Sequence, residues 1–422
     1  MLIFIDLDGT LTNTASTIYK PFKDGVEQLD VLKVPLIDGA IQFIKDLLSQ
    51  GQKLVIVSDS HTKYVDKIAK EIFNIPAISL CDKPNVEKIL HSINSDAELI
   101  RLFDDKNSCM LIGDSWLDIE LGRKLGIRTI LTQFYKIDKV DVRDGLGQDW
   151  KYKKAGATYY ANTFYKVAEI LKNPLQNLLT LEAIFHGVDT DKAVKFHYTM
   201  RSQGFWAFRC LARQEDGECD PFARADMYKQ IDNIARTPEF LAKLARACSN
   251  YLNTACNSSD HHWDFLTYVS DKRTTSPPNK MKEIFDLVEC KIKKVKIFEW
   301  SDSVVGSLRN NPNYKTRREF IGKYLKINTS VDLKDKNIIV IDDQFTSSAT
   351  AHEICTQLEK VGVKNILFVA LFYLTSHIDS KGCPDCGKPL KIKIKKSDGK
   401  KFYSCVSSIY GGNGCGKIIN IS

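Results

Sequence analysis

Two aspartates separated by one residue, Asp6 and Asp8, end an apolar run in the sequence LIFIDLDGT. On an extended chain, side chains two residues apart point the same way, so these carboxylates lie close together. Carboxylates packed so closely stay ionised only with a cation between them. Gly9 permits a tight turn directly afterwards. The pattern predicts a cation site at the end of a buried strand, with an acidic turn that binds nothing as the alternative.

Three later segments carry groups suited to phosphate chemistry. VIVSDS presents Ser58, whose hydroxyl can bind a phosphate oxygen, and CDKPN presents Lys83, whose ammonium can neutralise a phosphoryl group. MLIGDSWLD ends an apolar run with Asp114 and places Asp118 about one turn into the next helix. Ligands bind at the carboxyl ends of strands in open α/β sheets, so we expect these groups to converge.

Taken in this order, the segments DLDGT, VIVSDS, CDKPN and GDSWLD resemble the haloacid dehalogenase (HAD) superfamily. The resemblance implies that Asp6 attacks phosphorus to form an aspartyl-phosphate, while Asp8 protonates the leaving oxygen and then activates water. An aspartate at the second position favours a phosphatase over a dehalogenase. The resemblance also implies a bound Mg²⁺, held by Asp6, the Asp8 carbonyl, Asp114 and, directly or through water, Asp118. The implied phosphoryl-orienting groups are Thr10, Ser58 and Lys83.

The substrate is less well indicated, because HAD enzymes gain specificity from inserted cap segments. Only short stretches separate Thr10 from the helix expected near Asp38, and Ser58 from Lys83. We therefore expect a site that is open to a bulky or polymeric phosphate, or one that a later part of the chain covers. The expected substrate is a phosphorylated nucleotide, sugar or nucleic-acid end.

A second acidic strand end, NIIVIDDQFTSSATAHEI, continues into a loop of small residues that opens a helix. Backbone N–H groups at such a helix start form an anion site, and carboxylates accept hydrogen bonds from sugar hydroxyls. The segment resembles the phosphoribosyl-pyrophosphate (PRPP) motif of type I phosphoribosyltransferases. The resemblance implies that Asp342 and Asp343 contact ribose hydroxyls. It also implies a loop that holds the 5′-phosphate, here Thr346, Ser347, Ser348, Ala349 and Thr350.

Two departures leave the activity of this domain open. The family loop usually has glycine where this chain has Ser348, and SDKRTT (270–275) is only a candidate for the pyrophosphate loop. Lys315, Arg317 and Arg318 could belong to the basic mobile loop of the family. The domain is therefore a working transferase, a nucleotide sensor in a regulatory or defence protein, or a domain that only packs.

Four of the twelve cysteines have the spacing of metal ligands: Cys383, Cys386, Cys405 and Cys415. Two cysteine pairs around a basic hairpin fit a zinc ribbon, and Zn²⁺ would supply the folding energy that so short a segment lacks. The segment is similar to the small zinc ribbons of bacterial topoisomerases. Its lysines, interleaved with Phe402 and Tyr403, suit phosphate contact and base stacking. DNA or RNA is the expected partner, with protein as the alternative.

The bulk properties fit a multidomain globular protein. Of 422 residues, 43% are hydrophobic and 27% are charged, and no apolar run is long enough for a transmembrane helix. No basic leader precedes the first apolar run, so we expect a cytoplasmic protein without membrane contact, and no oligomeric state is indicated. The expected fold class is α/β, with two Rossmann-like parallel-sheet domains joined by a mainly helical region, plus a small zinc ribbon. The expected boundaries are 1–172, 173–258, 259–376 and 377–422.

Overall fold

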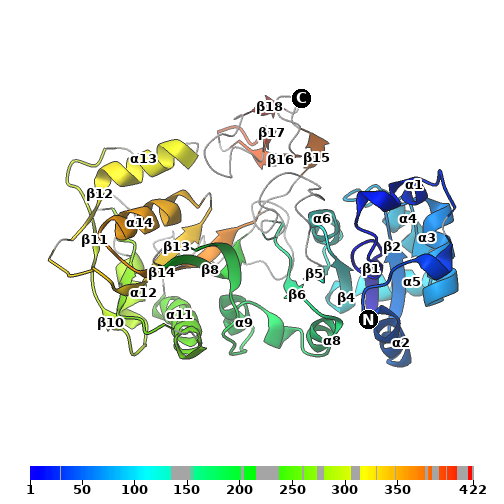
Figure 1. Ribbon diagram of the computed structural model, residues 1–422, viewed down its shortest axis with the longest axis horizontal. Coiled ribbons are helices and arrows are strands. Elements are labelled where there is room, and N and C mark those ends of the chain that lie inside the picture. Colours follow the sequence, from blue (N-terminus) through cyan, green and yellow to red (C-terminus); the bar gives the residue numbers. More distant parts are fainter. Residues whose placement is uncertain are drawn as a thin grey trace. The chain divides into compact units, whose positions relative to one another are not determined.

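The structure is a computed structural model that resolves the chain into two compact units (Figure 1). Unit 1 comprises Met1–Pro174, and unit 2 comprises the described residues from Leu175 onward. No helix among the described residues is long and apolar enough to cross a membrane. The described residues are 1–28, 30–134, 153, 155–200, 204–214, 237–258, 261–272, 280–305, 314–328, 330–346, 348–375, 379–382, 389–395, 397–405 and 417–420.

Unit 1 is built around a six-stranded sheet in the order β3-β2-β1-β4-β5-β6, in which every neighbouring pair is parallel. Its strands are almost entirely buried, as expected for parallel strands that are covered on both faces. The predicted parallel α/β fold is therefore confirmed for this unit. The strands are β1 (Leu2–Asp6), β2 (Lys53–Val57), β3 (Ala77–Ile78), β4 (Cys109–Gly113), β5 (Arg128–Thr132) and β6 (Tyr159–Ala161).

Helices cover both faces of this sheet. On one face Phe4 packs in a core with Ile89, Leu99 and Leu121, which come from α4, α5 and α6. Elsewhere in the unit, α2 and α8 meet through stacked rings of Phe43 and Phe164, whose centroids are 4.6 Å apart. The helices are α1 (Lys20–Lys23), α2 (Ala40–Ser49), α3 (Thr62–Ile68), α4 (Glu87–Asn94), α5 (Ala97–Asp104), α6 (Trp116–Lys124) and α8 (Phe164–Lys172).

Unit 2 contains a second six-stranded sheet, in the order β10-β9-β13-β14-β8-β7. All neighbours are parallel except the edge strand β7, which is antiparallel to β8. The strands of this sheet are β7 (Val194–Met200), β8 (Phe205–Gln214), β9 (Phe265–Tyr268), β10 (Lys293–Lys294), β13 (Asn337–Phe345) and β14 (Asn365–Leu374). A separate pair consists of β11 (Phe298–Trp300) and β12 (Leu325–Ile327). The helices are α9 (Thr180–Phe185), α11 (Pro238–Ser258), α12 (Lys280–Leu287), α13 (Tyr314–Tyr324) and α14 (Ala349–Lys360).

The stretch 173–258 differs from the expected mainly helical connection. It does contain α9 and α11, but it also contributes β7 and β8, and β8 pairs in parallel with β14 inside the second sheet. The sequence of β8 includes charged residues that obscure its burial. Arg213 is fully buried in β8 because its guanidinium donates to Glu182 of α9 at 2.8 Å. A charge matched in this way allows a polar residue inside a buried strand.

The end of the chain forms a four-stranded antiparallel sheet in the order β15-β16-β17-β18. The strands are β15 (Asp379–Gly382), β16 (Pro389–Ile394), β17 (Lys401–Cys405) and β18 (Ile418–Asn420). Its apolar core is small, with Leu390 packed against Tyr403 and Ile419. Cys383, Cys386 and Cys415 lie outside the described residues, as does the side chain of Cys405. The zinc ribbon therefore stays a prediction.

Candidate active site at the carboxyl end of the first sheet

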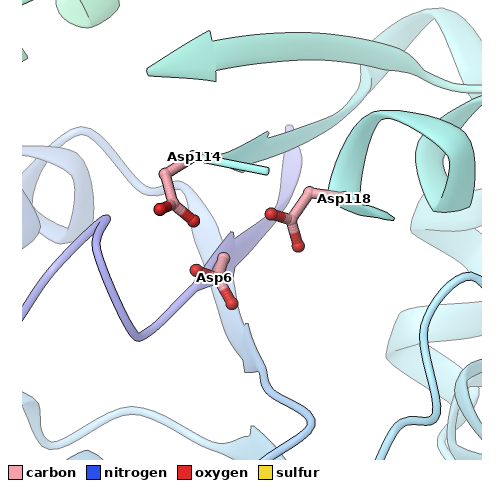
Figure 2. A group of neighbouring side chains, drawn as sticks. All are labelled: Asp6, Asp114 and Asp118. Carbon is pink, nitrogen blue, oxygen red and sulfur yellow. The ribbon is translucent and has the colours of Figure 1, made fainter. Parts of the chain in front are cut away.

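Three aspartates converge at the carboxyl end of the unit 1 sheet. Asp6 is the last residue of β1, and Asp114 directly follows β4, the parallel neighbour of β1. Asp118 lies in the first turn of α6 and points toward the other two (Figure 2). One carboxylate oxygen from each residue lies within 4.8 Å of the others, and all three residues are buried. The structure thus brings together three acids that the sequence placed in separate segments.

The start of α6 fixes the orientation of Asp118. Ser115 caps this helix, and its backbone N–H and hydroxyl both donate to Asp118 Oδ2, at 3.0 and 2.6 Å. Gly113 allows the close approach, since a Cβ at this position would lie 2.4 Å from the Asp118 side chain. Asp118 Oδ1 is left to face the site. The sequence GDSWLD is therefore a turn that aims one carboxylate oxygen inward.

Lys83 is the counter-charge of the cluster. Its Nζ lies 2.5 Å from Asp6 Oδ1 and 2.6 Å from Asp118 Oδ1, and the side chain is only 4% exposed. Its backbone N–H donates to Asp59 Oδ1 at 2.8 Å, which fixes the chain just before the lysine side chain enters the site. Asp59 was not among the predicted site residues. The only signal for it was its place beside Ser58 at the end of β2.

Negative charge is concentrated in this cluster, and it shifts the pKa values of the residues within it. Burial raises the pKa of Asp6 well above its usual value, and the charges of Asp118 and Asp114 raise it further against the opposing effect of Lys83. Burial alone would lower the pKa of Lys83, but Asp118 and Asp6 outweigh it and raise that pKa well above normal. With all three acids ionised, the charges are three negative and one positive. Such an oxygen-only donor set fits a hard divalent cation such as Mg²⁺.

Asp8 lies apart from this cluster, in a set of hydrogen bonds of its own. Its Oδ1 accepts from Thr14 at 2.6 Å and from the Tyr64 hydroxyl at 2.9 Å, and it lies 3.2 Å from Lys23 Nζ. Its Oδ2 accepts from Ser60 at 2.8 Å. None of these four donors was predicted from the sequence. Each contact closes a turn or joins distant segments, and the residue types alone gave no signal.

The two hydroxyls predicted to bind phosphate oxygens are buried and engaged within the protein. The Thr10 hydroxyl donates to Asp6 Oδ2 at 3.3 Å, and that of Ser58 donates to Asp8 Oδ2 at 3.4 Å. Both distances are long for O–H donors, so these are weak bonds that a better acceptor could replace. Thr10 and Ser58 therefore lie next to the carboxylates of Asp6 and Asp8, and their hydroxyls could donate to a phosphate oxygen instead.

The second predicted site, in unit 2, is formed by two adjacent aspartates near the end of β13 and the loop that leads into α14. Asp342 is buried near the end of β13, and burial together with the charge of Asp343 raises its pKa well above the usual value. The carboxylate of Asp343 forms an ion pair with Lys280 of α12, with 2.5 Å between Asp343 Oδ2 and Lys280 Nζ. Among the loop residues, Ser348 caps α14 with a left-handed φ of 62°, and Ala349 and Thr350 begin that helix. Ser347 lies outside the described residues.

The basic residues predicted for a mobile loop lie instead in a helix. Lys315, Arg317 and Arg318 belong to α13, which packs along α14. Arg317 donates to the hydroxyl of Thr346 at 3.2 Å, and Arg318 donates to Glu353 of α14 at 3.1 Å. Two of the three cations thus have partners, one in the loop before α14 and one in α14 itself. The loop expectation fails because these partners stabilise a helix.

Comparison with known proteins finds similarity to solved structures. No family model and no curated protein matches the sequence. Solved structures of HAD-superfamily phosphatases and hydrolases resemble about 40% of the chain. A predicted phosphatase from Clostridium acetobutylicum is 20% identical, covering 41% of this chain and 97% of its own, with a TM-score of 0.30. A HAD-superfamily hydrolase from Ehrlichia chaffeensis is 16% identical, covering 40% and 95%, with a TM-score of 0.29.

A HAD family hydrolase from Deinococcus radiodurans R1, solved with bound phosphate and sodium, is 14% identical. It covers 40% of this chain and 94% of its own, with a TM-score of 0.31.

Proposed function

We propose that unit 1 is a Mg²⁺-dependent phosphohydrolase that works through an aspartyl-phosphate on Asp6. The observation that carries the proposal is the convergence of Asp6, Asp114 and Asp118 on one buried point beside Lys83. Such a cluster is costly to fold without a cation, and the buried lysine supplies only part of the charge required. Phosphoryl transfer needs this kind of preorganised positive environment around a carboxylate nucleophile.

The reaction would proceed in two balanced steps. Asp6 attacks phosphorus, forming a carboxylate-oxygen–phosphorus bond while the ester oxygen–phosphorus bond breaks and the leaving oxygen takes a proton from Asp8. A water then attacks the phosphorus, gives a proton back to Asp8, and displaces Asp6 to release inorganic phosphate. Lys83 neutralises charge on the phosphoryl oxygens, and the Thr10 and Ser58 hydroxyls donate to them. Bound Mg²⁺, held by the acids of the cluster and the Asp8 carbonyl, would supply further charge neutralisation.

The expected substrate is a phosphorylated nucleotide, sugar or nucleic-acid end. Between β1 and α2 the described residues form only short helical turns, among them α1. Between β2 and β3 lies α3 with its continuation, Ala69–Phe73. Neither insertion is large enough to be a folded cap of its own. The lack of a folded cap in either insertion favours bulky or polymeric phosphate esters over small metabolites, with a site covered by a later part of the chain as the alternative.

Phosphate release tests the proposal directly. The wild-type protein should release phosphate from aryl and nucleotide phosphates with Mg²⁺, and an acid-quenched sample should contain phosphorylated protein. Asp6→Asn should do neither, whereas Asp343→Asn, at the other acidic strand end, should do both. Equal rates for the wild type and Asp6→Asn would end the proposal.

We propose in addition that the strand end of β13 binds PRPP or a nucleotide. The acidic pair is followed within a few residues by the first turn of α14, and Arg317 adds a cation at Thr346. This combination suits a ligand with both sugar hydroxyls and a phosphate. PRPP binding that Asp343→Ala abolishes would support a transferase coupled to the phosphatase. Nucleotide binding without turnover would favour the alternative, a sensor in a regulatory or defence protein.

A nucleic-acid partner is proposed for the C-terminal sheet, with Zn²⁺ held by its four cysteines. The antiparallel register sets Lys393 directly opposite Phe402, so a cation and an aromatic ring are cross-strand neighbours. That pairing suits a phosphate and an adjacent base. Binding to single-stranded DNA or RNA that weakens steeply with salt would support it. A salt-independent protein contact would favour the alternative partner.

A further inference from the structure

The short helix α1 brings an ammonium to the side chain of Asp8. Lys23, the last residue of α1, places Nζ 3.2 Å from Asp8 Oδ1, and the two side chains are only 17% and 12% exposed. We propose that Lys23 is a positioning residue that, with Tyr64, holds the Asp8 carboxylate in place to activate water against the phosphorylated enzyme. The inference rests on the proposed phosphohydrolase function and assigns a role to a segment that the HAD-like motifs do not include.

The contacts of Asp8 hold its carboxylate from several sides. Thr14 and Tyr64 donate to Oδ1 alongside Lys23, while Ser60 donates to Oδ2. Donors on both oxygens fix the rotation of the carboxylate plane as well as its position. Lys23 is the charged member of this set, and its partial burial limits screening by solvent. Its loss should therefore loosen Asp8 more than the loss of a single hydroxyl.

Lys23 is itself held by a contact between its own segment and the start of α3. The backbone N–H of His61, the N-cap of α3, donates to the Lys23 carbonyl at 2.7 Å. Gly25 lies against the same histidine, with a φ of +73°, and a Cβ there would be 2.5 Å from the imidazole ring. The helix that fixes Lys23 also carries Tyr64. α3 thus organises both the cation and the phenol that contact Asp8.

This arrangement suits the second half of the reaction. Asp8 accepts hydrogen bonds at both oxygens, which is how a carboxylate base is held before it takes a proton from water. In that step the water oxygen bonds to phosphorus, the Asp6–phosphorus bond breaks, and the water proton passes to Asp8. Attack by Asp6 on phosphorus does not need this base. A misplaced Asp8 should therefore slow hydrolysis of the aspartyl-phosphate, so that the phosphorylated protein accumulates.

Kinetics with p-nitrophenyl phosphate separate the two halves, because its leaving group departs without a proton. Lys23→Met should lower kcat on the order of tenfold, while kcat/KM stays within about twofold of the wild-type value. Acid-quenched samples should hold more phosphorylated protein at steady state than the wild type. Lys23→Arg should restore most of the lost kcat. Lys20→Met, on the exposed side of the same helix, is the matched control and should behave as wild type.

A second variant, Gly25→Ala, should disturb the contact between Lys23 and Asp8 without changing either residue. Gly25→Ala places a methyl group against the His61 ring, so it should move Lys23 and produce the same fall in kcat with kcat/KM retained. Combined with Lys23→Met it should add little, because both changes remove one contact. Thermal melts of all variants show whether each protein is folded.

Three results would overturn the inference. An active wild type whose kcat is matched by Lys23→Met refutes it and leaves the phosphohydrolase proposal standing. Equal falls in kcat and kcat/KM would make Lys23 a substrate-binding or structural residue. A wild type that releases no phosphate from any ester would refute both proposals together.

Discussion

Two strands of this protein, β1 and β13, carry aspartates at or near their carboxyl ends, but the surroundings of these aspartates differ. At the end of β1, Asp6 meets Asp114 and Asp118 from other elements, and one lysine, Lys83, pairs with both Asp6 and Asp118. At the end of β13, the acids are adjacent in sequence, so alternation of the strand sends them in different directions. Asp343 there forms an ion pair with Lys280 of α12.

The difference lies in convergence and in charge balance. Acids from three elements can surround a single ion, whereas two consecutive residues of one strand cannot readily do so. At β1 the ammonium of Lys83 pairs with two of the three clustered carboxylates. At β13 two carboxylates lie near one ammonium, that of Lys280, and a guanidinium, that of Arg317, lies at the following loop. A strand-end acidic pair alone therefore does not predict a metal site. Whether a metal ion can be surrounded depends on which other elements supply carboxylates.

The largest expected effect is that of removing the shared cation. Lys83→Met removes the ammonium that pairs with the buried carboxylates of Asp6 and Asp118. It should destabilise metal-free unit 1 by about 3–5 kcal/mol, the usual cost of breaking a buried ion pair from one side. Lys280→Met removes the ammonium beside the partly exposed Asp343, and it should destabilise unit 2 clearly less. Urea denaturation of both variants measures the difference, with hydrogen exchange in β1 and β13 assigning each transition to its unit.

Equal losses in the two variants would mean that the β1 cluster is not more strained than the pair at β13. A loss in Lys83→Met that Mg²⁺ reverses would instead sharpen the contrast. It would show that an ion can replace the charge of the lysine.

The next effect is the response of the wild-type protein to Mg²⁺. Because the cluster at β1 has excess negative charge, Mg²⁺ at about 100 times its dissociation constant should stabilise unit 1 by about 2.7 kcal/mol. Unit 2 should not respond through Asp342 and Asp343. Differential scanning calorimetry with and without Mg²⁺ tests this, and Asp114→Asn, which removes one ligand, should weaken the response. A Mg²⁺ shift that persists in Asp114→Asn but disappears in Asp343→Asn would reverse the assignment.

Much of this contrast could be predicted from the sequence, because its acids sit at strand ends or in a first helical turn. Asp6, Asp114 and Asp342 each close an apolar run, and Asp118 follows a serine cap by three residues. Local rules of strand ends and capping apply to such positions. The neighbouring positions of β1 and β4 in the sheet then follow from the parallel βα pattern.

The supporting residues could not be predicted in this way. Tyr64 contacts Asp8 across 56 positions of sequence, and a tyrosine on a helix has many more ordinary roles. Lys23 lies in a segment with neither strand nor long-helix periodicity. The strand β8 was missed for a related reason, since Arg213 looks like a surface residue until its buried partner Glu182 is known. Contacts of this kind depend on tertiary structure that no local pattern contains.

A smaller effect concerns pH at the β13 strand end. Burial and the charge of Asp343 raise the pKa of Asp342 well above the usual value of an aspartate, so the folded state retains a proton that the unfolded state releases. The contribution of Asp342 to the free energy of unfolding of unit 2 is fully present at pH values below the pKa of Asp342 in the unfolded chain. This contribution is lost as pH rises through the higher pKa of Asp342 in the folded protein. Each unit of pKa shift corresponds to about 1.4 kcal/mol. Asp342→Asn should therefore gain stability over the wild type at pH 8 relative to pH 5.

Urea denaturation of unit 2 at the two pH values, followed by hydrogen exchange in β13 and β14, measures this. Asp335→Asn, at an exposed turn of the same unit, is the control and should show no such pH-dependent gain. If the stability difference between Asp342→Asn and the wild type were the same at both pH values, Asp342 would not carry the proton.

The smallest expected effect comes from the backbone of the loop before α14. Ser348 adopts a φ of 62°, a left-handed conformation that costs residues with a Cβ on the order of 1 kcal/mol and glycine very little. Ser348→Gly should therefore stabilise unit 2 by about 0.5 kcal/mol, because the larger entropy of the unfolded glycine offsets part of the gain. Asn74→Gly in unit 1, at a φ of 51°, should gain less, since asparagine tolerates this conformation. If Ser348→Gly instead destabilised unit 2, the contacts of the serine side chain would outweigh the strain, and its presence in place of glycine would serve the fold of the loop.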